Sequence, residues 1–81
     1  MKDIWKYIAL GRKVYKYVEE QNSKGEYPTV RELARKYKLK NDEIITLVED
    51  NDDLGYNIGI RVGSGHYVEK YKGDYTVEVT D

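Results

Sequence analysis

The sequence holds one row of cations with a regular spacing. Arg31, Arg35 and Lys38 stand at positions i, i+4 and i+7, the spacing of side chains along one side of an α-helix. Such a row can bind a run of phosphates, because charge-assisted hydrogen bonds to phosphate oxygens are strong. It is equally typical of an ordinary solvated helix surface, and the residues alone leave both interpretations open.

A group of residues suited to contacts with base edges follows directly. Asn41 can pair with adenine through two hydrogen bonds, and Asp42 can accept one from the amino group of cytosine. Thr46 can bond to either kind of base edge, and Ile45 can contact the methyl group of thymine. Lys40 precedes the group and adds a cation. Together with the row above, these residues indicate phosphate contacts beside base contacts.

A third group of candidates surrounds the glycine-rich segment 63–65. Arg61, His66 and Lys70 flank Gly63-Ser64-Gly65, and a flexible tip that carries cations can enter a minor groove. The alternative is a plain tight turn.

Other kinds of chemistry find little support. His66 is the only histidine and cysteine is absent, so neither a histidine relay nor a thiolate site can be assembled. The acidic segment 49–55 is superficially similar to a calcium loop, but Arg61 stands where the closing glutamate would be. We therefore expect a protein that is not an enzyme and that has no metal and no cofactor.

Length and charge narrow the class further. The 81 residues suffice for one domain with a small core, and no stretch approaches the roughly 20 apolar residues of a membrane span. The N-terminal residues are interrupted by charges, unlike a signal peptide, so we expect a cytoplasmic protein without membrane contact. Residues 1–40 carry eleven Lys or Arg against five Asp or Glu, a net of +6, whereas residues 41–81 carry three against ten, a net of −7. This asymmetry favours one face that meets a charged partner, although the two halves could instead pair with each other.

Three helices are expected to position these side chains. Apolar spacing predicts a first helix from Asp3 to about Gln21, and Gly11 in the middle of its inner face predicts a close backbone contact. Trp5 lies toward the polar side, where it is expected to pack under the last strand or, alternatively, to anchor a second subunit. The apolar face of this helix comprises Ile4, Tyr7, Ile8, Gly11, Val14, Tyr15 and Val18.

Two further helices follow. Thr29 and Glu32 form a capping box that opens the second helix. After a turn at 38–40, Asn41 is expected to cap the third. The residues expected in the core of these helices and of the strands behind them are Leu33, Ala34, Leu39, Ile44, Leu47, Val48, Ile58 and Ile60.

Behind the helices the period changes from helical to alternating. Segments 56–62, 66–71 and 75–79 are expected to form an antiparallel meander with turns at 63–65 and 72–73. The last strand would then have a free edge.

Segment 27–49, YPTVRELARKYKLKNDEIITLVE, resembles the helix-turn-helix of bacterial and archaeal transcription regulators. Its entry, PTVRELA, is similar to gluconate-repressor-like regulators and to the SOS-repressor DNA-binding domain. With the helix before it and the strands behind it, nearly the whole chain resembles the winged-helix family. The resemblance implies an α+β fold, namely a single winged-helix domain over residues 1–81 with the helix-turn-helix at 30–49. Its antiparallel wing of two to three strands would span residues 54–80. The family usually has glycine in the turn where this chain has Lys38, so Lys38 must adopt a left-handed conformation or the turn must differ.

The same resemblance implies a small DNA-binding protein, a transcription regulator of a prokaryote, an archaeon, a mobile element or a virus. The third helix would lie in the major groove, the second across the phosphates and the wing in the neighbouring minor groove of double-stranded DNA. Regulators of this kind commonly pair two domains across a palindrome, so a homodimer is expected. The implied DNA-binding residues are Arg31, Arg35, Lys38, Lys40, Asn41, Asp42, Thr46, Arg61, His66 and Lys70.

The acidic third helix supports an alternative. Asp42, Glu43, Glu49 and Asp50 would lie near phosphates, and each uncompensated anion opposes DNA binding. The chain could instead be a winged-helix protein-interaction module that docks this helix on a basic protein, with Ile45 in an apolar contact and the last strand's edge open to another strand. DNA binding predicts that the cations form one continuous outer patch, whereas protein docking does not.

Overall fold

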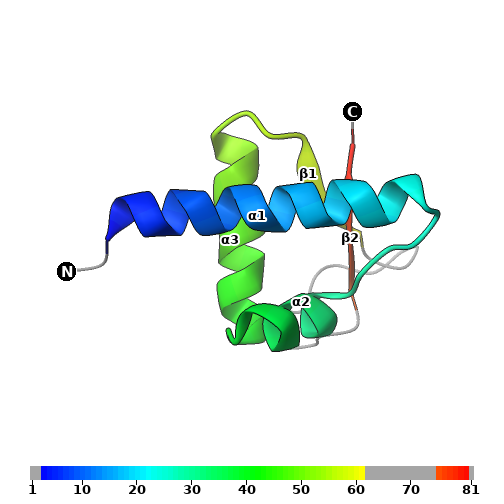
Figure 1. Ribbon diagram of the computed structural model, residues 1–81, viewed down its shortest axis with the longest axis horizontal. Coiled ribbons are helices and arrows are strands. Elements are labelled where there is room, and N and C mark those ends of the chain that lie inside the picture. Colours follow the sequence, from blue (N-terminus) through cyan, green and yellow to red (C-terminus); the bar gives the residue numbers. More distant parts are fainter. Residues whose placement is uncertain (1–2, 62–74, 81) are drawn as a thin grey trace.

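The computed structural model describes residues 3–61 and 75–80 of the chain. Its elements follow in the order α1 (Ile4–Ser23), α2 (Val30–Tyr37), α3 (Asn41–Asp53), β1 (Ile58–Arg61) and β2 (Thr76–Val79). α1 crosses α3, α2 lies at the N-terminal end of α3, and both strands lie near the C-terminal half of α1 (Figure 1). The described residues thus form an α+β fold with three helices and a two-stranded antiparallel sheet. The strand expected at 66–71 and the turns at 63–65 and 72–73 lie outside the described residues.

Side-chain caps fix the starts of α1 and α2. The Asp3 carboxylate accepts hydrogen bonds from the backbone N–H groups of Trp5 at 3.0 Å and Lys6 at 3.3 Å. The Thr29 hydroxyl accepts from the backbone N–H of Glu32 at 3.1 Å, and the Glu32 carboxylate accepts from that of Thr29 at 3.3 Å. The capping box expected at the start of α2 is confirmed, and it satisfies two backbone donors that the helix leaves open.

The start of α3 differs from the expectation. Lys40, and not Asn41, occupies the N-cap position, and Asn41 is the first helical residue. A lysine side chain has no acceptor for the free backbone donors, so the N-cap side chain cannot cap the helix. The Glu43 carboxylate instead accepts the backbone N–H of Lys40 at 2.8 Å.

The turn between α2 and α3 is left-handed at Lys38. This residue has φ 57° and ψ 47°, and its backbone N–H donates to the carbonyl of Ala34. It is the only residue other than glycine with positive φ in the part of the chain that the structure describes. Of the two alternatives that the sequence left open, Lys38 itself adopts the left-handed conformation usually given to glycine.

β2 is hydrogen-bonded on both of its sides, although the sheet itself consists of β1 and β2. On one side it pairs with β1, with Ile58 opposite Val79 and Ile60 opposite Val77. On the other side the segment 28–30 is bonded to it: the N–H of Val77 donates to the carbonyl of Pro28 at 2.9 Å, and the N–H of Val30 to that of Tyr75 at 2.7 Å. The expected free edge of the last strand is therefore wrong, and so is the simple meander order, because both sides of β2 are occupied.

The core lies where the three helices meet the sheet. The burial expected for Leu33, Ala34, Ile44, Leu47, Val48 and Ile58 is confirmed, whereas Leu39 and Ile60 are only half-buried. The remaining buried apolar side chains are Val14, Val18, Val30, Ile45 and Val77.

Gly11 marks a close contact between α1 and α3. Asn51 is 3% exposed, and its side-chain N–H donates to the Gly11 carbonyl at 2.9 Å. A β-carbon on Gly11 would stand 2.5 Å from the Asn51 Oδ1, which is too close for any side chain. The close contact expected at Gly11 is confirmed, with Asn51 as its partner.

The first turns of α1 project beyond the body of the molecule (Figure 1). Ile4 is 63% and Trp5 is 76% exposed, so the predicted packing of Trp5 under the last strand is wrong, as is the placement of Ile4 on the buried face. The physical reason is that β2 is held at the opposite end of α1. There the Asn22 side-chain oxygen accepts the backbone N–H of Val79 at 2.8 Å.

Candidate nucleic-acid interface

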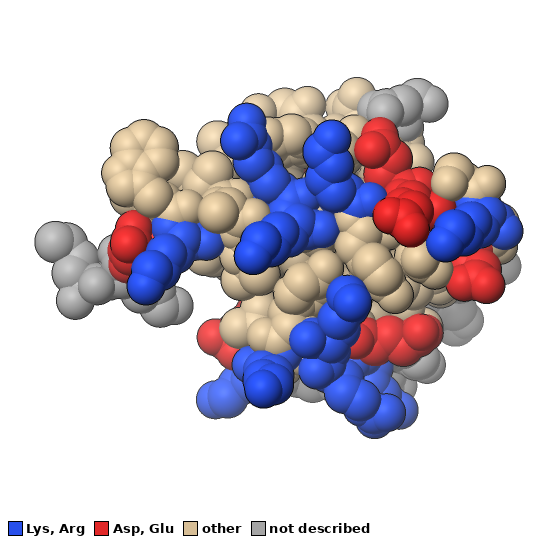
Figure 2. Space-filling model, in the orientation of Figure 1, with Lys and Arg blue, Asp and Glu red and all other residues tan. Residues whose placement is uncertain are grey.

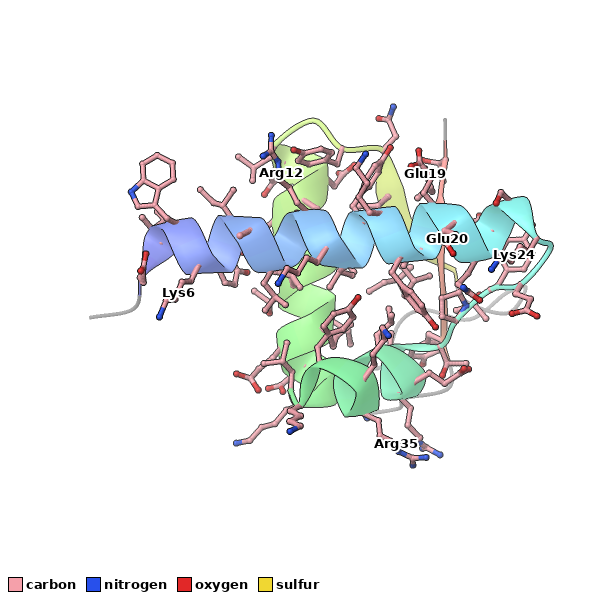
Figure 3. The ribbon with its side chains drawn as sticks, viewed as in Figure 1. Lys6, Arg12, Glu19, Glu20, Lys24 and Arg35 are labelled. Atoms are coloured by element: carbon pink, nitrogen blue, oxygen red, sulfur yellow. The ribbon has the colours of Figure 1, made fainter. Side chains whose placement is uncertain are left out.

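The outer side of α2 carries the cations whose spacing first indicated a phosphate contact. Leu33 and Ala34 are buried on the side of α2 that packs against the core. Arg31 and Arg35 lie on the other side of the helix and are exposed. Arg35 points away from the body of the molecule (Figure 3). The left-handed turn then presents Lys38, which is also exposed.

Lys40 extends this row to the start of α3, and its side chain is exposed. We call Arg31, Arg35, Lys38 and Lys40 the basic ridge. None of its side chains forms an ion pair with any described residue, since the one such pair in the described ranges joins Lys24 to Glu20 at 3.4 Å. Figure 2 shows basic side chains gathered along α2 at the lower edge of the molecule. The described acids thus leave the ridge unpaired, and its cations are exposed to solvent.

The residues expected to face bases stand next to the ridge, with one exception. Asp42 and Thr46 are exposed one helical turn apart on α3, and Asn41 is half-buried at its first position. Ile45 is only 2% exposed, so its predicted contacts with a thymine methyl group or with an apolar partner are wrong. α3 packs against α2, α1 and β1, which buries a broader side of the helix than its apolar spacing suggests.

Most acidic groups of α3 either accept a hydrogen bond or lie far from the ridge. Glu43 caps the helix start, and the Asp50 carboxylate accepts a hydrogen bond from the Tyr7 hydroxyl. With a rise of about 1.5 Å per residue, Glu49 lies about 12 Å and Asp53 about 18 Å along the helix from Asn41. These separations exceed the screening length of about 8 Å at physiological salt. Asp42 is the one acid of α3 beside the ridge that forms no hydrogen bond with a described residue.

The hydrogen bond between Tyr7 and Asp50 ties the acidic helix to α1. Burial of the phenol, reinforced by this bond to a carboxylate, raises the pKa of Tyr7 to about 12. The hydroxyl therefore stays protonated at neutral pH and keeps donating to Asp50.

A second basic region, missed by the sequence reasoning, lies between α1 and α2. Lys13, Lys16 and Lys36 line a shallow groove there together with Tyr17 and Tyr37. The Lys36 ammonium lies 4.5 Å from the centre of the Tyr17 ring and 5.7 Å from that of Tyr37, a cation–π arrangement. Burial raises the pKa of Tyr37. The lysines on the outer side of the first helix were the available signal, and Figure 2 shows basic side chains over both α1 and α2.

The candidates near the glycine-rich segment fall largely outside the described residues. Arg61 ends β1 opposite Thr76, but its side chain is not described, and His66 and Lys70 lie in 62–74. Among the side chains of 3–61 and 75–80 that are described, no group of three or more His, Cys, Asp or Glu could hold a metal ion. The helices of those ranges include none with the length and apolar character needed to cross a membrane.

Comparison with known proteins gives no match. No family model fits the sequence, and no curated protein or solved structure is detectably similar to it. The geometry and charge of the ridge and of α3 are therefore the features that bear on function.

Proposed function

We propose that this chain is a small winged-helix protein that binds double-stranded DNA as a transcription regulator. The observation that carries the proposal is the basic ridge, whose four cations, Arg31, Arg35, Lys38 and Lys40, are exposed and without ion pairs to described residues. Binding of phosphates to such cations releases counterions, which supplies much of the affinity of DNA-binding proteins.

The order of elements supports the winged-helix part of the proposal. Segment 28–30, β2 and β1 lie side by side behind a helix pair joined by a tight turn, an arrangement compatible with that fold. In this family the wing is the connection between two strands of the sheet. The proposal therefore assigns the wing to the sequence between β1 and β2, which contains His66 and Lys70.

The N-terminal part of α3 would read the bases. With the ridge on phosphates, Asn41, Asp42 and Thr46 are the side chains of α3 beside it that can form hydrogen bonds to base edges. The acidic C-terminal end of α3 lies at the end of the helix away from α2 (Figure 1). This arrangement weakens the objection that an acidic helix cannot approach DNA.

Fluorescence anisotropy of labelled duplex DNA tests the proposal. Arg35→Ala should weaken binding about equally on every sequence and lower the slope of log affinity against log salt by roughly one. Lys24→Ala, which removes a cation that lies in neither basic region and pairs with Glu20, is the control and should have a smaller effect. Thr46→Ala should change the preference among sequences with little change of the slope, and Asp42→Asn should strengthen non-specific binding. Absence of binding by the unaltered protein at low salt and tens of micromolar would overturn the proposal.

A second candidate function is docking of α3 on a basic protein. It is favoured by exposed acids at Asp42, Glu49, Asp52 and Asp53 on a helix without any lysine or arginine. Such docking would depend on charge, because Ile45 is buried and β2 has no free edge. Binding to a lysine-rich peptide that Glu49→Gln weakens, together with no binding to DNA, would select this function.

A further inference from the structure

The groove between α1 and α2 gathers positive charge that the described residues do not neutralise. Its charged lining consists of Arg12, Lys13, Lys16, Glu20 and Lys36, so a single acid stands among the cations. We call Lys13, Lys16 and Lys36 the lysine cluster. All three are exposed, and none forms an ion pair with a residue of 3–61 or 75–80. A bound anion would therefore reduce the repulsion that the fold imposes on them.

Two half-buried tyrosines position one of these lysines. The rings of Tyr17 and Tyr37 meet edge-on at 6.5 Å, and the Lys36 ammonium lies 4.5 Å from the centre of the Tyr17 ring. An ammonium group has three donors, and a ring on one side of it leaves others available to an anion. The cluster thus combines a cation that aromatic rings hold in place with two lysines of α1.

The lysine cluster and the basic ridge face different directions. Consecutive residues of an α-helix point about 100° apart, so Lys36 lies about 100° around α2 from Arg35 and about 140° from Arg31. Arg35 points away from α1 (Figure 3), whereas the groove lies between α1 and α2. A short duplex is stiff, because DNA bends easily only over lengths of about 150 base pairs. A duplex on the ridge therefore leaves the lysine cluster unoccupied.

We propose that the lysine cluster binds the phosphates of a second DNA duplex, so that one protein molecule holds two duplexes together. The inference rests on the proposed DNA binding by the ridge. Lysines contact phosphates as point charges and read no bases, so the second contact would be independent of sequence.

The lining of the groove favours a phosphate backbone over an acidic protein segment. It includes no aliphatic side chain, whereas the centre of a protein–protein interface is enriched in apolar contacts and poor in charge. The groove is also shallow, which suits the exposed backbone of a polymer better than a small molecule that needs enclosure.

A capture assay measures whether two duplexes are held at once. One duplex is fixed to beads and a labelled duplex is free in solution, each of about 16 base pairs and so too short to bend around the protein. The unaltered protein should retain the labelled duplex on the beads at about 0.15 M salt. Fluorescence anisotropy of a single labelled duplex reports the binding by the ridge separately.

A double substitution identifies the surface. Lys13→Gln with Lys16→Gln removes two cluster cations of α1 and leaves the ridge intact. Loss of two phosphate contacts should lower the retained duplex at least about tenfold at about 0.15 M salt, while the affinity for one duplex falls less than about twofold. Lys6→Gln is the control, because Lys6 is an exposed lysine of α1 that does not line the groove, and it should change retention little. Circular dichroism verifies that each variant folds.

The outcomes distinguish this inference from the proposed function. A protein that binds no DNA would overturn both. Binding of one duplex without capture of a second would overturn the inference alone. Capture that survives the double substitution would show that another surface, such as a contact between two protein molecules, joins the duplexes, and would overturn the assignment to the lysine cluster. Polyglutamate that prevents capture at a lower concentration than free duplex does would assign the cluster to an acidic protein instead.

Discussion

At Gly11 the backbone of α1 and the side chain of Asn51 leave no room for a β-carbon. Alanine at this position would improve helix propensity by about 1 kcal/mol. It would also displace the buried Asn51 amide from the Gly11 carbonyl, which costs about 1–3 kcal/mol, and the steric contact adds to that cost. We expect Gly11→Ala to lower the free energy of unfolding by about 1–2 kcal/mol in urea denaturation.

A double-mutant cycle separates the contact from helix propensity. In an Asn51→Ala background the obstacle is gone, so Gly11→Ala should be neutral or stabilising there. An equal loss in both backgrounds would contradict the structural explanation.

The phenol of Tyr7 should make stability sensitive to alkaline pH. Its pKa is raised from 10.0 to about 12 in the folded protein, so between these values the folded state holds a proton that the unfolded state has lost. The stabilisation is complete below pH 10 and is lost as the pH rises toward 12. We expect Tyr7→Phe to cost about 0.5–1.5 kcal/mol at neutral pH and to make the decline between pH 10 and 12 less steep. Tyr27→Phe, at an exposed position, should stay within about 0.5 kcal/mol of the parent at neutral pH.

The turn from α2 to α3 depends on a lysine in a conformation that glycine adopts more easily. A left-handed backbone costs a residue with a β-carbon roughly 1–2 kcal/mol, and glycine avoids this but loses more entropy on folding. We expect Lys38→Gly to raise the free energy of unfolding by up to about 1 kcal/mol in denaturant melts. Lys13→Gly is the matched control: it is exposed within α1 and should destabilise by about 1 kcal/mol. A destabilising Lys38→Gly would contradict the turn geometry.

The sequence alone predicted those features that depend on residues close together in the chain. The capping box of Thr29 and Glu32, the left-handed Lys38 and the inward faces of α2 and α3 all follow from residues within one or two turns of each other. Gly11 predicted a close contact, but its partner Asn51 could not be found, because the crossing of α1 and α3 is a property of tertiary packing.

The predictions that were wrong concern surfaces whose burial depends on an element far away in the sequence. Ile45 was expected outside, but α3 meets several neighbours at once and is buried over a broad side. Trp5 was expected inside, but the strand meant to cover it lies at the other end of α1. The place of β2 between β1 and 28–30 likewise depends on residues far apart in the chain. In the candidate site, the ridge positions were therefore predictable, whereas the groove between α1 and α2 was not.

In residues 3–61 and 75–80, cations and anions gather in different places more often than they pair. α3 has no lysine or arginine, while Lys13, Lys16 and Lys36 line one groove between α1 and α2. The single ion pair among the described residues, Lys24 with Glu20, has both side chains more than half exposed and adds little.

This separation predicts an unusual response to salt. Added salt screens repulsion and attraction alike, but the described residues contain a cluster of lysines and one exposed ion pair. Salt should therefore relieve more repulsion than it removes attraction, and the Tm at low protein concentration should rise with added NaCl. Lys16→Gln should reduce that rise, whereas Lys24→Gln should not. A Tm that falls with salt would show that attractive pairs dominate.

The position of β2 between β1 and segment 28–30 also determines the order in which structure can form. The helices are built from contacts between near neighbours, whereas β2 must meet residues 28–30 across a long stretch of chain. Closing such a loop costs entropy before its contacts contribute, so the sheet should complete late in folding. Val77→Ala, at a fully buried position of β2, should then accelerate unfolding in stopped-flow measurements and change the refolding rate little. The lifetime of the folded protein, more than the speed at which it forms, would depend on this last strand.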